Sequence, residues 1–312
     1  MPTRIALGVF AGLISAAMFS ITMTGVPLAL LAGYFASLPL FAVGLARGYL
    51  MAGLGGLTGM VAIASIGGVV FAVPFLMAFA APVTVLVRQA LLARPSQGGG
   101  MEWYPAGHLV VVLASLAVVL FAGSLVTLGM TSGNAMATLE SLVRDTVEQI
   151  NPVVSSRLTP EGVSLTAALV PGLAAASWMV MVALNGMLAQ TILRRREWNV
   201  RPGGDLASMV VPTWPALAAA GGGLLLWAGD GWAALLGGLV TFVAAVVYLF
   251  LGLAVVHTVS RAWTWRTPAL VFFYGALILV YQITVPAVVL LGLIEPWLGI
   301  RARVIAAGGR EE

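Results

Sequence analysis

Charged residues are so scarce in this chain that they limit what it can fold into. Only 8% of the 312 residues are charged and 61% are hydrophobic, and the mean hydropathy is +1.05. A water-soluble domain carries about 25% charged residues, because its surface must be solvated. The composition therefore predicts an all-α polytopic membrane protein, since helices satisfy their own backbone hydrogen bonds inside a bilayer.

Apolar runs divide the chain into segments of membrane-spanning length. A helix needs about 20 mostly apolar residues to cross a bilayer. Charges, Gly/Pro clusters and aromatic residues separate the runs, and we predict helices at 5–22, 26–46, 49–66, 69–91, 107–130, 162–192, 208–228, 231–259 and 267–294. Pro286 interrupts the last of them, so we expect eight or nine crossings within one integral membrane domain, 1–312.

The arginines, which are the only basic residues apart from two histidines, predict the orientation of the chain. With the N-terminus in the cytoplasm, ten arginines fall on that side, and only Arg144 and Arg157 fall on the other. This bias follows the positive-inside rule and favours an inner-membrane protein with a cytoplasmic N-terminus. Nine crossings would place Arg301, Arg303 and Arg310 outside, against the rule. Single arginines at helix ends do not form a nucleic-acid-binding patch, so no nucleic-acid partner is expected.

The sequence carries no recognisable motif for catalysis, metal binding or cofactor binding. It lacks cysteine and has two histidines, which argues against thiolate chemistry and against a histidine metal site. It has no Walker-type Gly-Lys-Ser/Thr, no His-Glu-x-x-His and no Gly-x-Ser-x-Gly motif. We therefore expect no catalytic residues, no metal and no cofactor, and predict that the protein is not an enzyme.

Neutral polar residues inside the predicted helices are the candidates for ligand binding. Asn185 and Gln190 lie in the sixth predicted helix, and Tyr281 and Gln282 come just before Pro286 in the ninth. A proline frees a backbone carbonyl that a ligand or a neighbouring side chain can use. Such residues also form hydrogen bonds between helices, worth about 0.6 kcal/mol each. Both interpretations, a small-molecule cavity and interhelical packing, stay open.

Small residues recur at four-residue spacing on the first predicted helix. Gly8, Gly12 and Ala16 form one stripe there. Small residues let two helices approach closely inside a membrane. The stripe predicts either packing within the protein's own bundle or docking of another membrane subunit.

Two connecting segments are long enough to have roles of their own. Apolar and charged residues alternate at helical spacing in 132–161, which predicts an extracytoplasmic amphipathic helix ended by Asn151 and Pro152. Thr159 is the predicted N-cap of the helix that follows. The amphipathic helix either lies on the bilayer or forms a lid over an outward-facing cavity. The glycine-rich segment 94–105 is predicted to be a flexible tether.

A basic loop follows the sixth predicted helix. Arg194, Arg195, Arg196 and Arg201 lie in it. On the cytoplasmic side of a membrane, such a cluster is attracted to anionic lipid. We predict that this loop contacts the lipid surface or a cytoplasmic protein.

Four segments of the chain resemble known families. Residues 38–59, a Pro-led apolar helix, a Gly-centred turn and a Gly-rich helix, resemble the early spans of S components of energy-coupling-factor vitamin transporters. With segments 102–107, 193–202 and 292–301, the chain resembles the alphaproteobacterial branch of the YybS-like bacterial membrane proteins, a domain-of-unknown-function family. The resemblance implies an S-component-like core whose first helix docks a coupling subunit through small residues. The chain departs from S components by having two or three helices more than their usual six.

Two functions follow as hypotheses. The first is a small-solute transport or substrate-binding component without its own ATPase, which binds its ligand near Asn185 and Gln282 and takes energy from a partner subunit. The second is a structural or scaffold membrane protein, in which the polar residues only pack and the basic loop contacts lipid or a cytoplasmic partner. An intramembrane enzyme acting on lipid has the least support.

Overall fold

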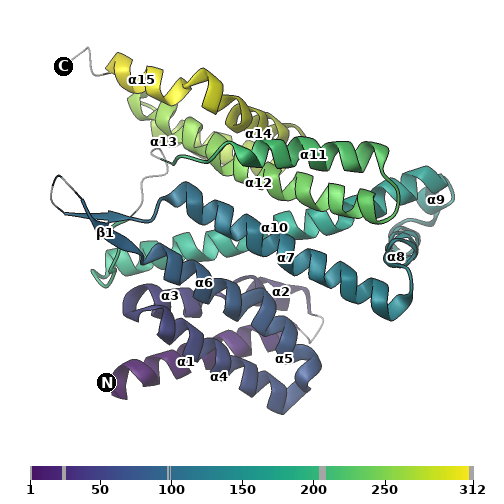
Figure 1. Cartoon of the computed structure of the whole chain (residues 1–312), viewed down its shortest axis with the longest axis horizontal. Helices are drawn as coiled ribbons and strands as arrows, with labels where there is room; N and C mark the ends of the chain where they lie inside the picture. The colour runs from purple at the N-terminus through teal and green to yellow at the C-terminus, as the bar shows by residue number, and fades with distance from the viewer. Residues whose placement is uncertain (1, 23–25, 97, 99, 204–208, 309–312) are drawn as a thin grey trace. The chain divides into compact units, whose positions relative to one another are not determined.

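The computed structural model describes residues 2–22, 26–96, 98, 100–203 and 209–308, and these are helical almost throughout (Figure 1). The α-helices are α1 (Pro2–Ile21), α2 (Pro27–Tyr34), α3 (Leu38–Arg47), α4 (Tyr49–Gly67), α5 (Val69–Phe75), α6 (Ala81–Ala90), α7 (Ala106–Ser132), α8 (Ala135–Ile150), α9 (Pro152–Ser155), α10 (Pro160–Arg195), α11 (Trp214–Ala228), α12 (Trp232–Val259), α13 (Arg266–Leu279), α14 (Tyr281–Leu298) and α15 (Ile300–Gly308). A π-helix, η2 (Leu76–Ala80), a 3-10 helix, η4 (Ser260–Ala262), and two short strands, β1 (Ala93–Pro95) and β2 (Met101–Trp103), complete the described elements. The predicted helix 208–228 begins later than expected, at Trp214, because residues 209–213 are not helical, which corrects that span. Position 208 itself and the tail residue Arg310 lie outside the described residues.

Seven stretches of described helix are long and apolar enough to cross a membrane. They are Thr3–Ile21, Tyr49–Gly67, Val69–Ala90, Ala106–Ser132, Pro160–Arg195, Trp232–Val259 and Tyr281–Leu298. The number of crossings reaches the predicted eight or nine only if some of the shorter apolar helices also cross. These are Leu31–Arg47, Trp214–Ala228 and Arg266–Leu279. The prediction of an all-α polytopic helical bundle is confirmed.

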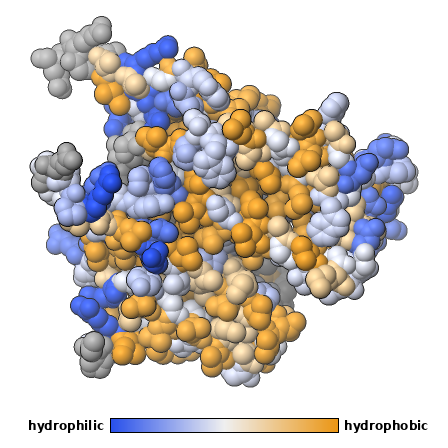
Figure 2. Space-filling model, in the orientation of Figure 1, coloured by the Kyte–Doolittle hydropathy of each residue, from blue (hydrophilic) through white to orange (hydrophobic). Residues whose placement is uncertain are grey.

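Large apolar side chains on these helices face outward. Val61 is 68% exposed, Val119 is 72% exposed and Leu279 is 82% exposed. Figure 2 shows hydrophobic residues over much of the visible surface, with hydrophilic residues at α8 and α9 on the right and a second set on the left, around the β1 hairpin. Lipid tails solvate such side chains as well as a protein core does, so this surface suits a bilayer.

The chain forms two compact units. Unit 1 contains Met1–Leu116 and Trp178–Gly204, and unit 2 contains Ala117–Ser177 and Asp205–Glu312. Helices α7 and α10 each contribute one part to unit 1 and the other part to unit 2. A single integral membrane domain stays a prediction.

The stripe of small residues on α1 packs inside unit 1. A Cβ atom on Gly12 would lie 2.7 Å from the carbonyl carbon of Gly55 on α4, and one on Gly8 would lie 3.2 Å from the Met51 oxygen. Ala16 is buried as well. The absent side chains therefore allow the backbones of α1 and α4 to touch.

The second predicted helix is not continuous, which corrects the expected span 26–46. The chain turns at 35–37 between α2 and α3, and Pro39 stands in the first turn of α3. Pro39 has no N–H, so it cannot donate to the oxygen of Phe35 as a residue in a continuous helix would. The N–H of Leu38 bonds to the oxygen of Phe35 (3.0 Å) instead of to that of Tyr34, one full turn back.

The last predicted helix, 267–294, is also two helices. The break lies at Val280, with φ −125° and ψ 40°, and not at Pro286, which sits inside α14. Thr284 Oγ1 donates to the oxygens of Ala276 (3.2 Å) and Val280 (3.0 Å), which also accept from backbone N–H groups, and so adds hydrogen bonds across the break. The prediction that the helix is interrupted at Pro286 is therefore wrong, because the interruption lies six residues earlier, at Val280.

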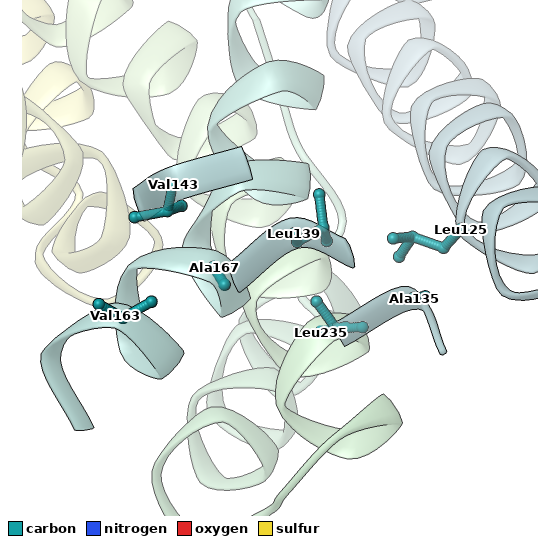
Figure 3. Packing of buried hydrophobic residues seen from close by; sticks show 7 residues of the cluster. All are labelled: Leu125, Ala135, Leu139, Val143, Val163, Ala167 and Leu235. Atoms are coloured by element: carbon teal, nitrogen blue, oxygen red, sulfur yellow. The ribbon is translucent and has the colours of Figure 1, made fainter. Parts of the chain in front are cut away.

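The amphipathic segment forms α8, and its predicted end at Asn151 and the predicted N-cap at Thr159 are confirmed. Asn134 caps it by accepting from the N–H of Ala137 (3.1 Å), Asn151 follows its last residue, and Thr159 Oγ1 accepts from the N–H of Gly162 (3.1 Å) at the start of α10. The buried face of α8 packs on its own unit (Figure 3). The cluster there consists of Leu125, Ala135, Leu139, Val143, Val163, Ala167 and Leu235.

The predicted flexible tether contains a short hairpin. In it, β1 pairs antiparallel with β2, and Arg94 lies opposite Glu102. The Arg94 Nε atom donates to a Glu102 carboxylate oxygen at 2.8 Å. This contact holds the pKa of the Glu102 carboxyl below its usual value. The cross-strand ion pair and the paired backbone explain why this part of the segment is ordered.

Candidate functional site

The break between α2 and α3 leaves backbone oxygens that side chains of other helices bind. Asn185 Nδ2 on α10 donates to the oxygen of Tyr34 at 2.8 Å. Ser15 Oγ on α1 donates to the oxygen of Ala36. Both donors are buried, with 1% exposure for Asn185 and none for Ser15. Burying a backbone carbonyl in a bilayer without a hydrogen-bond donor costs roughly several kcal/mol of free energy. These two hydrogen bonds therefore stabilise the break.

One face of α10 reaches two irregular places in unit 1. Trp178, seven residues before Asn185, donates its Nε1 proton to the oxygen of Ala78 in η2 at 2.9 Å. Pro82 lacks the N–H that would bond Ala78 in a regular helix. Residues seven apart lie on the same side of a helix. The same face of α10 therefore holds a π-helical segment and a helix break, two features that are frequent at functional sites in proteins.

Two oxygens at the break have no hydrogen-bond partner within the described chain. They are Asn185 Oδ1 and Ser37 Oγ. Ser37 is fully buried at the N-cap of α3. A buried polar group without a partner costs about 1–3 kcal/mol, so such groups call for an explanation. We call the break residues 35–37 together with Asn185 the break site.

The break site carries no charge of its own, and the side-chain hydrogen bonds there go to backbone oxygens. In unit 1 the charged residues lie at helix ends or in connecting segments. They are Arg4, Arg47, Arg88, Arg94, Glu102, Arg194, Arg195, Arg196, Glu197 and Arg201. An ion in a neutral, buried place would keep a large desolvation cost, so this chemistry favours an uncharged molecule.

Gln190 lies in a different cluster of the same unit. Its Nε2 donates to the Arg201 oxygen at 2.7 Å, and Asn199 Nδ2 donates to the same oxygen at 2.9 Å. The Arg201 guanidinium donates to the oxygens of Ala90 (3.1 Å) and Tyr104 (2.8 Å). Burial lowers the pKa of Arg201, but an arginine starts so high that it stays protonated. Arg201 thus ties three segments together.

The other predicted site residues belong to other elements than the break site. Tyr281 is 57% exposed, and Gln282 is also exposed, in the first turn of α14 in unit 2. Arg194, Arg195 and Arg196 are exposed at the end of α10. Ligand binding by the first pair and surface contact by the arginines stay predictions.

Sequence reasoning missed a buried ion pair at the end of α14. The Arg301 Nε atom lies 2.8 Å from Glu295 Oε1, and the side chains are 14% and 5% exposed. The same carboxylate accepts from the N–H of Ile300 (2.9 Å), and Arg301 also donates to the Met209 oxygen (2.7 Å). Gly299, in left-handed conformation, makes the turn that brings the pair together. The sequence pattern that could have predicted this pair is a glutamate and an arginine on either side of a glycine that ends a helix.

Groups of three or more acidic or histidine side chains that could hold a metal ion are absent from the described residues.

Comparison with known proteins identifies one family. A family described as "Predicted membrane protein (DUF2232)" matches residues 13–295. No curated protein and no solved structure matches the chain. The family match covers the break site and ends at Glu295.

Proposed function

Because the chain belongs to the DUF2232 family of predicted membrane proteins, we propose that it is a solute-binding component of a membrane transport system. The observation that supports this proposal most is the pair of buried, unpartnered oxygens at the break site, Asn185 Oδ1 and Ser37 Oγ. Transporters commonly bind their substrates where a membrane helix is interrupted.

The chemistry of the break site limits the solute. Asn185 Oδ1 accepts hydrogen bonds, and the Ser37 hydroxyl both donates and accepts. The lack of charge at the break site and the apolar neighbours Leu40 and Phe41, both buried, disfavour an ion. We propose an uncharged small molecule that carries at least one hydrogen-bond donor. The protein would bind and release it without chemical change, and so would not act as an enzyme.

Energy for transport would come from elsewhere. The sequence has no nucleotide-binding motif. We therefore propose another membrane subunit as a partner, as the likeness to S components of energy-coupling-factor transporters implies. Gly8, Gly12 and Ala16 are the residues that this likeness assigns to docking, although their face of α1 meets α4. The arginine distribution favours the inner membrane, with a cytoplasmic N-terminus.

Replacing Ser37 with alanine tests the proposal. Ser37 Oγ has no partner in the described chain, so its loss removes a buried polar atom without breaking a protein contact. We expect thermal stability to stay equal or to rise, while retention of a co-purifying solute in native mass spectrometry falls about tenfold, the value of one good hydrogen bond.

Ser15→Ala is the matched control. The Ser15 hydroxyl bonds to the Ala36 oxygen, so its loss leaves a carbonyl unpaired and should lower stability. If Ser37→Ala retains as much solute as the natural protein, Ser37 does not bind the solute.

A scaffold role is the second candidate function. The exposed side chains of Arg194, Arg195 and Arg196 at the end of α10 favour it. They would contact anionic lipid or a cytoplasmic protein.

A further inference from the structure

The start of α13 in unit 2 carries a hollow that is independent of the break site. Its volume is about 450 Å³, and Arg266, Thr267, Leu270, Val271 and Tyr274 line it. All five lie along one face of the helix, because their spacing follows helical turns. Polar groups stand at the first turn, and apolar ones follow for the next two turns.

Arg266 is the cation at the polar end, and it is in neither of the two ion pairs described among the residues that the structure covers, Arg94–Glu102 and Arg301–Glu295. Arg266 Nε is buried, yet it has no hydrogen bond within the described chain. The described acid nearest to α13 along the chain, Glu295, is engaged by Arg301. A guanidinium in this state favours a phosphate, which accepts several of its hydrogen bonds at once.

The neighbouring residues place the polar end of the hollow at the membrane boundary. Trp263 and Trp265 stack with ring centroids 5.0 Å apart and are 42% and 59% exposed. Tryptophans of this kind collect at the level of the lipid headgroups. Further along α13, Phe272 and Ile278 are 79% and 73% exposed, as suits contact with lipid tails.

The lining residue farthest from Arg266 along α13, Tyr274, contacts α12. Tyr274 Oη lies 2.8 Å from His257 Nε2, and the two rings are 6.0 Å apart between centroids. This contact helps to position the tyrosine that lines the hollow. Leu270 and Val271, between Tyr274 and the arginine, offer an apolar wall to a hydrocarbon chain.

We propose that this hollow binds an anionic phospholipid. The phosphate lies against Arg266 and Thr267, and an acyl chain runs along Leu270 and Val271. The apolar half of the hollow favours a lipid over free phosphate, since inorganic phosphate gains nothing from that wall.

The test uses the full-length protein in detergent micelles and native mass spectrometry. Phosphatidylglycerol and phosphatidylcholine are titrated against the natural protein, Arg266→Gln and Thr267→Val. We expect phosphatidylglycerol to bind more tightly than phosphatidylcholine, and Arg266→Gln to weaken its binding about tenfold, as befits one charge-assisted contact. Thr267→Val keeps the shape of the side chain and should weaken phosphatidylglycerol binding by a smaller factor. If Arg266→Gln does not fold, Thr267→Val still tests the site.

Arg303→Gln is the matched control, because it removes the same charge from an exposed position on α15. It should leave phosphatidylglycerol binding unchanged. Equal weakening by Arg303→Gln and Arg266→Gln would overturn the proposal, since net charge alone would then explain binding. Competition by millimolar inorganic phosphate as strong as that by the lipid would also overturn it, in favour of a free anion.

Discussion

Replacing Arg301 with leucine is expected to destabilise the protein by about 3–5 kcal/mol, because it leaves a buried charge without its partner. Glu295 is 4% exposed, and its carboxylate lies 2.8 Å from the Arg301 guanidinium. The loss should also release the Met209 oxygen, which Arg301 binds. Equilibrium unfolding of the purified protein in mild detergent measures the difference.

Two variants make this result specific. Glu295→Gln combined with Arg301→Leu should be more stable than Arg301→Leu alone, because no uncompensated charge stays buried. Arg94→Leu breaks an ion pair of the same 2.8 Å separation whose side chains are 76% and 52% exposed, and should change stability little. If Arg94→Leu and Arg301→Leu lower the free energy of unfolding equally, burial does not explain how much the Glu295–Arg301 pair contributes to stability.

Replacing Gly12 with alanine is expected to have the second large effect. The new Cβ atom would lie 2.7 Å and 2.9 Å from backbone carbon atoms of Gly55, and a backbone cannot move aside as a side chain does. Helices α1 and α4 would have to separate, at a cost of about 1–3 kcal/mol or more, as for other overpacked interfaces. Thermal unfolding followed by circular dichroism would report the loss.

Gly53→Ala is the control, because Gly53 lies on α4 only two residues from Gly55. Its Cβ atom would lie 3.5 Å from Thr84 Cγ2, an ordinary van der Waals contact. Alanine also favours a helix over glycine, so we expect stability to be unchanged or slightly higher. A Gly12→Ala variant as stable as Gly53→Ala would show that close packing of α1 and α4 is not required.

Local features of the sequence predicted the local features of the fold. The caps at Thr159 and Asn151 were predictable, because a capping side chain and the N–H groups it accepts from are neighbours in the chain. The composition likewise predicted a helical membrane protein, since a bilayer leaves few other ways to pair backbone groups.

The break site could be predicted only in part. The intramembrane position of Asn185 drew attention to it, but the Tyr34 carbonyl that it binds is 151 residues away in the chain. The sequence did not indicate Ser37 as a site residue. Ser37 stands out because it is fully buried and its hydroxyl has no partner among the described residues, and neither property can be seen in the sequence. Pro39 was visible in the sequence, yet Pro286 interrupts no helix, so proline alone did not tell where a helix breaks.

The buried ion pair was missed for a related reason. Glu295 and Arg301 are six residues apart, a spacing that brings no two side chains together on a regular helix. The left-handed conformation of Gly299 ends α14 between them and allows the two side chains to meet. Charge patterns predict pairs within a helix better than pairs across a turn.

Native mass spectrometry of the gently solubilised natural protein tests the central claim most directly. The account predicts a defined small mass, of an uncharged molecule, bound in addition to lipids and retained about tenfold less by the Ser37→Ala variant. A protein that carries only lipids, across several mild detergents and from freshly prepared membranes, would contradict solute binding and favour the scaffold role.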